Sequence, residues 1–97
     1  MSMYLIRGAY SADGLQGLVK EGGAARKEAV SQLVQSLGGR LEAFYYTLGE
    51  DDTLVIAELP DNVTATALSI AANASGAVRV SMTVLLTPEE IDEATRK

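Results

Sequence analysis

Short apolar runs alternate with glycines and polar turns along the N-terminal part of the chain. Residues 3–10 form an apolar run that predicts a strand, and residues 11–14 have the polar composition of a helix start. The glycine pair at 22–23 breaks this first helix. Residues 30–37 then carry valine and leucine at helical spacing, and a second glycine pair at 38–39 ends the second helix. We therefore expect one strand followed by two helices.

A pair of strands is predicted in the middle of the chain. Residues 40–48 are rich in aromatic side chains, and residues 53–59 are β-branched and strongly apolar. The segment between them, residues 49–52, is short enough to join the two strands as an antiparallel hairpin. This hairpin tip is unusually acidic, because it contains Glu50, Asp51 and Asp52 in succession.

The C-terminal part of the chain predicts a helix, a strand and a short last helix. Pro60 closes the preceding strand, and Asp61 can cap a helix whose apolar face is mostly alanine. Residues 78–86 alternate apolar and polar side chains, as a half-buried strand does. Residues 87–90 read Thr-Pro-Glu-Glu, which is a capping box with proline at the first helical position.

The order of these elements predicts an α+β fold of the ferredoxin-like βαββαβ type, in a single domain over residues 1–97. Right-handed crossovers would place the helices on one face of a four-stranded antiparallel sheet with strand order 4-1-3-2. The other face would then lack helices.

The composition excludes several kinds of chemistry. The 97 residues include no cysteine and no histidine, so disulfides, thiolate nucleophiles, Ser-His-Asp catalysis and the usual zinc or haem ligands are absent. The net charge of −5, with scattered basic residues, argues against nucleic acid. No segment has the length and apolarity of a signal peptide or a membrane span. We expect a cytoplasmic protein without cofactor, and with neither nucleic acid nor a membrane as partner.

The face of the sheet without helices is predicted to be an interface. The charged residues Arg7, Glu42, Glu58 and Arg79 set the side of each strand, because a charge beneath the helices would be costly. The same side then carries a mostly apolar set: Leu5, Phe44, Tyr46, Leu48, Leu54, Ile56, Ser81, Thr83 and Leu85. A face this apolar usually marks an interface, so we expect a homodimer in which two sheets pack face to face as a dimeric α/β barrel.

The charged residues on this face allow two interpretations. Glu58 can pair with Arg7 or Arg79 in a buried ion network that fixes the register of the dimer. Alternatively, Glu58, with Tyr46, can act as a catalytic acid or base while Arg7 and Arg79 bind an anionic ligand. Both interpretations use the same residues, and the sequence leaves them open.

The chain also resembles a known family. Residues 38–61 (GGRLEAFYYTLGEDDTLVIAELPD), with Arg26 upstream and residues 76–90 downstream, resemble the GYD-domain proteins. The family's Gly-x-Tyr-Asp turn falls on residues 49–52, where Gly49 and Asp52 match and Asp51 replaces the tyrosine. The resemblance implies a ferredoxin-like fold of the dimeric α/β-barrel type and a family that is mostly bacterial and archaeal.

Two classes of function remain open at this point. A noncatalytic module would use the dimer to bind a small molecule or as a scaffold, and we favour this class because spacing alone reveals no set of acid, base and oxyanion donors. A cofactor-free enzyme, similar to the monooxygenases and isomerase-like enzymes of the wider superfamily, is the alternative. No metal site is expected, since Glu50, Asp51 and Asp52 are adjacent and cannot all face one ion.

Overall fold

Eight elements follow one another with short connections. The computed structural model describes all 97 residues. The order of strands and helices is the predicted one: β1 (Ser2–Tyr10), α1 (Ala12–Glu21), α2 (Gly23–Ser36), β2 (Arg40–Tyr46), β3 (Thr53–Leu59), α3 (Asn62–Ala74), β4 (Val78–Leu85) and α4 (Pro88–Thr95).

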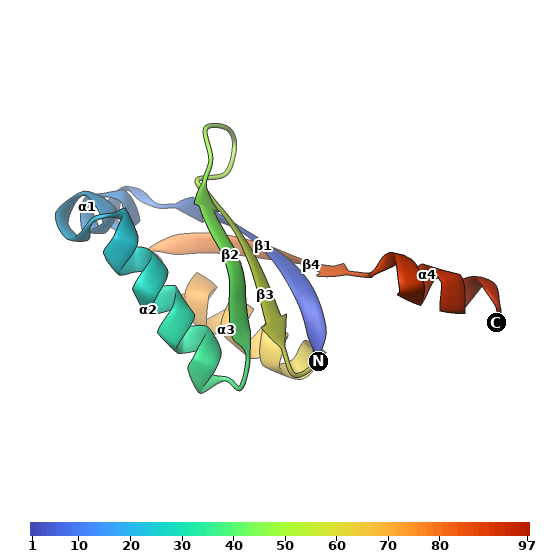
Figure 1. Cartoon of the computed structure of the whole chain (residues 1–97). Coiled ribbons are helices and arrows are strands. Elements are labelled where there is room, and N and C mark those ends of the chain that lie inside the picture. The colour runs from blue at the N-terminus through green and yellow to red at the C-terminus, as the bar shows by residue number, and fades with distance from the viewer.

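The four strands form one antiparallel sheet in the order β2-β3-β1-β4. This order is the predicted 4-1-3-2 read from the opposite edge, so the α+β, ferredoxin-like prediction is confirmed. Helices α2 and α3 lie on the same side of the sheet, as Figure 1 shows. Helix α2 packs against the edge strand β2, and α3 packs mainly against the other edge strand, β4. We call the side that they cover the helix face and the other side the open face.

The helices begin where the sequence predicts capping. The Asp61 carboxylate accepts a hydrogen bond from the backbone N–H of Thr64 at 2.8 Å, and this bond lowers the pKa of Asp61. Thr87 and Glu90 form the predicted capping box at the start of α4. Gly38 ends α2 with a φ of 82°, a left-handed conformation that other residues rarely adopt.

The core lies between the sheet and the two helices. The central strands β1 and β3 contribute alternate residues, α2 contributes one residue and α3 contributes two. The set is Tyr4, Ile6, Val34, Val55, Ala57, Leu59, Ala65 and Leu68. The Tyr4 hydroxyl donates a hydrogen bond to the Asn62 side chain, so the one polar end of this buried ring is satisfied.

A β-bulge in β2 makes part of the face prediction wrong. Leu41 pairs with Ala57, but Ala43 pairs with Ile56, so the register shifts between Leu41 and Ala43. A shift of one residue turns every following side chain to the other side of the sheet. Phe44 therefore packs against the core on the helix face.

Tyr46 follows the same register. It pairs with Thr53, a buried residue of the helix face, and Tyr45 rather than Tyr46 lies on the open face. Leu48, also predicted on the open face, belongs to the hairpin tip and is fully exposed. The other predicted open-face residues of β1, β3 and β4 are on that face.

Helix α4 lies apart from the rest of the chain. Figure 1 shows it at the end of an extension of β4, separated from both the sheet and the other helices. Its Ile91 is 47% exposed, and Leu86 before it is 59% exposed. None of the helices has the length and apolarity needed to cross a bilayer.

Candidate functional site

The open face is the first region with functional character. The strand register shows which residues lie on this face, because directly paired residues of neighbouring strands place their side chains on the same side of the sheet. The apolar members are all partly or largely exposed in the single chain: Met3, Leu5, Ala43, Tyr45, Leu54, Ile56 and Leu85. No helix covers them, so this face exposes a contiguous apolar surface.

The charged residues predicted on this face are present but are not all close together. Arg7 and Arg79 line one hollow, together with Glu50 and Asp51 of the hairpin tip. The nearest acidic partner of Arg7 is Asp51, whose Oδ2 lies 3.9 Å from Nε. The hairpin tip thus supplies a partner for Arg7 that the strand pattern did not predict.

Glu58 lies at the other end of the same face. It pairs with Met3 of β1, four residues before Arg7, which places it roughly 13 Å along the strand from that arginine. Its neighbour on β2 is Arg40. Glu58 therefore makes no ion pair with Arg7 or Arg79 within one chain.

Tyr46 is separated from Glu58 by the sheet itself. Its hydroxyl donates a hydrogen bond to the Gly23 carbonyl at 3.1 Å, at the start of α2. Partial burial raises the pKa of Tyr46, and the neighbouring Tyr10 adds to this effect. A joint role of Glu58 and Tyr46 in proton transfer would need both side chains at one site, and the fold of a single chain does not bring them together.

The acidic hairpin tip is attached to β1. The Asp52 carboxylate accepts a hydrogen bond from the backbone N–H of Tyr10 at 2.8 Å, and the Asp52 N–H donates to the Gly8 carbonyl, also at 2.8 Å. The predicted role of Asp52 as an acceptor of backbone amides is thereby confirmed. No three acidic side chains in the chain come together in the way that a metal ion requires.

Replacing Asp52 should loosen this attachment. We expect Asp52→Ala to lower the free energy of unfolding by about 1.5–3 kcal/mol, because a hydrogen bond to a charged acceptor is lost and a backbone N–H is left without its partner. Asp51→Ala is the matched control and should cost under about 0.5 kcal/mol, since its ion pair with Arg7 is long and exposed. Urea unfolding of the two variants measures the difference, and equal losses would contradict the assigned role of Asp52.

A cavity between α2 and α3 is the second region with functional character. The two helices pack over opposite edges of the sheet, so they leave a gap above the central strands. The cavity in this gap has a volume of about 340 Å³. Twelve of its 15 lining residues are hydrophobic, and the whole set is Ile6, Tyr10, Arg26, Ala29, Val30, Leu33, Phe44, Thr53, Val55, Leu68, Ala71, Ala72, Ser75, Val78 and Val80.

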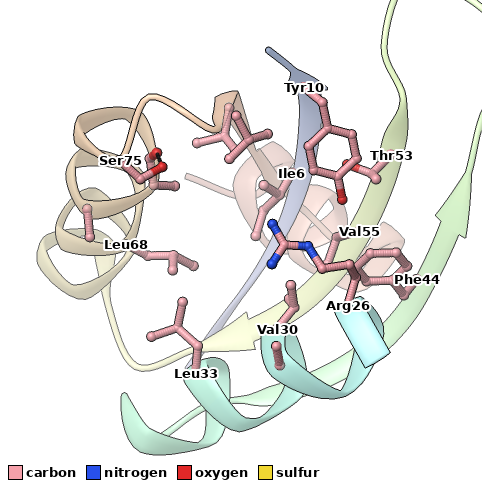
Figure 2. Close-up of a pocket in the computed structure, with 15 residues that line it drawn as sticks. Ile6, Tyr10, Arg26, Val30, Leu33, Phe44, Thr53, Val55, Leu68 and Ser75 are labelled. Atoms are coloured by element: carbon pink, nitrogen blue, oxygen red, sulfur yellow. Dashed lines mark hydrogen bonds between the residues drawn. The ribbon is translucent and has the colours of Figure 1, made fainter. Parts of the chain in front are cut away.

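Arg26 is the only charged residue in the cavity lining. Figure 2 shows that its guanidinium points from α2 into the cavity and that the hydroxyl end of Tyr10 is directed toward it. The Arg26 side chain is 27% exposed, and its only acidic partner is Glu21, whose Oε2 lies 3.5 Å from Nη1. The Arg26 side chain is therefore largely buried, and its one ion pair is long.

The signal for this cavity in the sequence is weak. The apolar face of α3 is mostly alanine, and Ala71 and Ala72 belong to it. In the structure both residues line the cavity, because α3 packs mainly over β4 while α2 packs over β2. The spacing of helices across a sheet depends on tertiary packing, which the pattern of one helix does not specify.

The architecture and these two regions define a small α+β domain with an uncovered sheet face and a cavity under its helices. The chain belongs to the GYD domain family, whose model matches residues 4–95. The resemblance in the middle of the sequence is confirmed by this match, which extends over nearly the whole chain. Searches of curated proteins and of solved structures gave no match.

Proposed function

We propose that this GYD-domain protein is a noncatalytic, homodimeric binding module. In this proposal the open faces of two copies pack against each other as a dimeric α/β barrel, and the cavity under the helices of each copy holds a small molecule. The observation that carries the proposal is the uncovered apolar surface of the open face.

The apolar character of the open face supports a second copy of the chain as its cover. Leu5 and Ile56 lie opposite each other on the central strands, flanked by Leu54 and Leu85, and all four are partly exposed to solvent. Contiguous apolar patches of this kind on soluble domains usually belong to interfaces. Two sheets can pack against each other through their apolar faces, and a two-fold axis would bring the same face of both copies into contact.

The position of α4 also supports a dimer. The radius of gyration of the chain is 14.4 Å, whereas a compact domain of this length would have about 12.5 Å. The excess comes from the arm that carries α4 beyond the sheet (Figure 1). Leu86 and Ile91 on this arm are largely exposed in the single chain, and a second copy of the chain could cover them.

The arrangement of ionisable groups favours binding over catalysis. Glu58 and Tyr46 are on opposite faces, and Arg7 already pairs with Asp51. In the dimer that we propose, Glu58 and the open-face arginines serve to fix the register of the two sheets. The enzyme alternative would require Glu58 to meet an arginine of the second copy in an open pocket between the sheets.

Thiol protection tests the proposed interface directly. The chain has no natural cysteine, so a single introduced one reports its own accessibility. Thr83 is exposed on the open face of the single chain, and Thr66 is exposed on α3. We expect Thr83→Cys to react with a thiol reagent about tenfold or more slowly than Thr66→Cys, because the reaction must wait for the dimer to open.

The control for this experiment is the same pair of variants in denaturant, where the two cysteines should react at similar rates. Equal rates for the two folded variants would mean that the open face stays accessible, and this result would contradict the proposed interface.

A further inference from the structure

We propose that the cavity between α2 and α3 binds a hydrophobic monocarboxylate, with Arg26 as the residue that binds the carboxylate group. This inference deepens the binding role proposed above by naming the class of ligand. The cavity lies on the helix face of a single chain, so a test of ligand binding there is independent of a test of the proposed dimer on the open face.

The cavity has the size and chemistry of a site for an apolar body. Its volume of about 340 Å³ lies within the range of roughly 300–1,000 Å³ of small-molecule sites. Its floor consists of Ile6 and Val55 of the central strands, and its walls include Leu33 of α2 and Leu68 of α3. An apolar chain or ring inserted there would contact the buried Ile6, Val55 and Leu68 and would remove the exposed part of Leu33 from water. The cavity is about twice the volume of one that holds benzene.

Arg26 gives the cavity a single point of positive charge. Its guanidinium has five N–H donors, yet it forms no hydrogen bond within the chain, and its ion pair with Glu21 is 3.5 Å long. Because the Arg26 side chain is largely buried and its guanidinium points into an apolar cavity, an anion that reached it would be bound more strongly than at the surface (Figure 2). A planar carboxylate matches the two parallel donors of the guanidinium fork.

The charges at the start of α2 also favour a bound anion beside Arg26. The first turn of this helix contains no acidic residue, and no side chain caps its N-terminus at Gly22. Instead Arg26 and Lys27 follow close behind, although positive charge near the N-terminal end of a helix is unfavourable. A bound carboxylate beside Arg26 would compensate both the helix dipole and these cations.

The charge of the ligand follows from the rest of the lining. Arg26 is the only cation in the cavity, and Glu21 stands beside it, so a second negative charge would have no partner and an acidic neighbour. Apart from Arg26 and Tyr10, the only polar residues in the cavity lining are Thr53 and Ser75. The Ser75 hydroxyl already donates a hydrogen bond to the Ala72 carbonyl. The site therefore suits one carboxylate on an otherwise apolar molecule.

Isothermal titration calorimetry with octanoate and octan-1-ol tests this inference, because the two probes share an apolar chain and differ in the charged group. We expect saturable binding of octanoate in the wild-type protein, at least about tenfold tighter than that of octan-1-ol, since a hydrogen-bonded charge pair is formed only with the carboxylate. Arg26→Gln should remove this difference. Lys27→Gln, which removes the adjacent cation outside the cavity lining, should retain it.

A second variant tests the location of the ligand. Ala72→Leu places extra atoms in the cavity without changing charge, and it should weaken both probes. Circular dichroism and the mass in solution of each variant establish that it is folded and that its assembly is unchanged. Three results would overturn the inference: no saturable octanoate binding to the wild-type protein, equal binding of the two probes, or equal losses for Arg26→Gln and Lys27→Gln. None of these results would bear on the dimer.

Discussion

Ile56→Asp is expected to convert the proposed dimer to a monomer. Ile56 lies at the centre of the open face, between Leu5 of β1 and Ala43 of β2. A carboxylate at this position would be buried without a partner in the proposed interface, and the two-fold symmetry would place two of them there. An unpaired buried charge costs several kcal/mol, so the dissociation constant should rise about a thousandfold or more.

The fold of the single chain should survive this change. Ile56 is partly exposed on the open face and is not one of the core residues, which lie on the helix face. Light scattering gives the mass of the variant, and circular dichroism shows whether it is folded. Ile70→Asp is the matched control, because Ile70 is 64% exposed on α3, and it should leave the proposed dimer intact. A folded Ile56→Asp variant that remains dimeric at low micromolar concentration would contradict the assigned interface.

Gly39→Ala should cause a large loss of stability, because the added methyl group would clash with the backbone of the neighbouring strand. A Cβ at Gly39 would lie 2.2 Å from the Glu58 carbonyl oxygen and 2.9 Å from Cδ2 of Leu59, which is fully buried. The Glu58 backbone cannot move without disturbing the pairing of β2 with β3. We expect a loss of about 3 kcal/mol, at the upper end of the cost of overpacking.

Thermal unfolding at equal protein concentration measures this loss. A change of about 3 kcal/mol corresponds to a decrease in Tm of roughly 12–24 °C in a domain of this size. Gly49→Ala is the control, because a Cβ at Gly49 would meet no atom within 4 Å, and it should change the stability by less than about 0.5 kcal/mol. A Tm for Gly39→Ala that matches the control would mean that the junction between α2 and β2 is less tightly packed than the structure indicates.

Most of the fold could be predicted from the sequence, because its signals are local. The glycine pairs, the Asp61 cap and the Thr87–Glu90 capping box act over a few residues, and each begins or ends an element where expected. The strand order then follows from the handedness of the crossovers, which holds for nearly all such connections.

The faces of β2 could not be predicted from its pattern. A bulge between Leu41 and Ala43 adds one residue to the strand, and this places Tyr45 rather than Tyr46 on the open face. In the segment RLEAFYY two adjacent tyrosines satisfy either register equally well, so the pattern does not reveal the shift. The bulge is specified by how β2 pairs with β3, which is a tertiary interaction.

The proposed ligand site could not be predicted from the sequence for a similar reason. Arg26 and Lys27 are a pair of basic residues on a helix, and such pairs are common. What distinguishes Arg26 is its position over a gap that exists because α2 and α3 pack on opposite edges of the sheet. The pairing of Arg7 with Asp51 depends likewise on how the hairpin tip is attached to β1 through Asp52.

The central claim is that two copies of this chain cover each other's open face, and the mass of the wild-type protein in solution tests it most directly. Multi-angle light scattering at low micromolar concentration should give twice the mass of one chain, unchanged over a tenfold dilution. A mass of one chain under these conditions would contradict the account, because the apolar open face would then be exposed to water in the native protein.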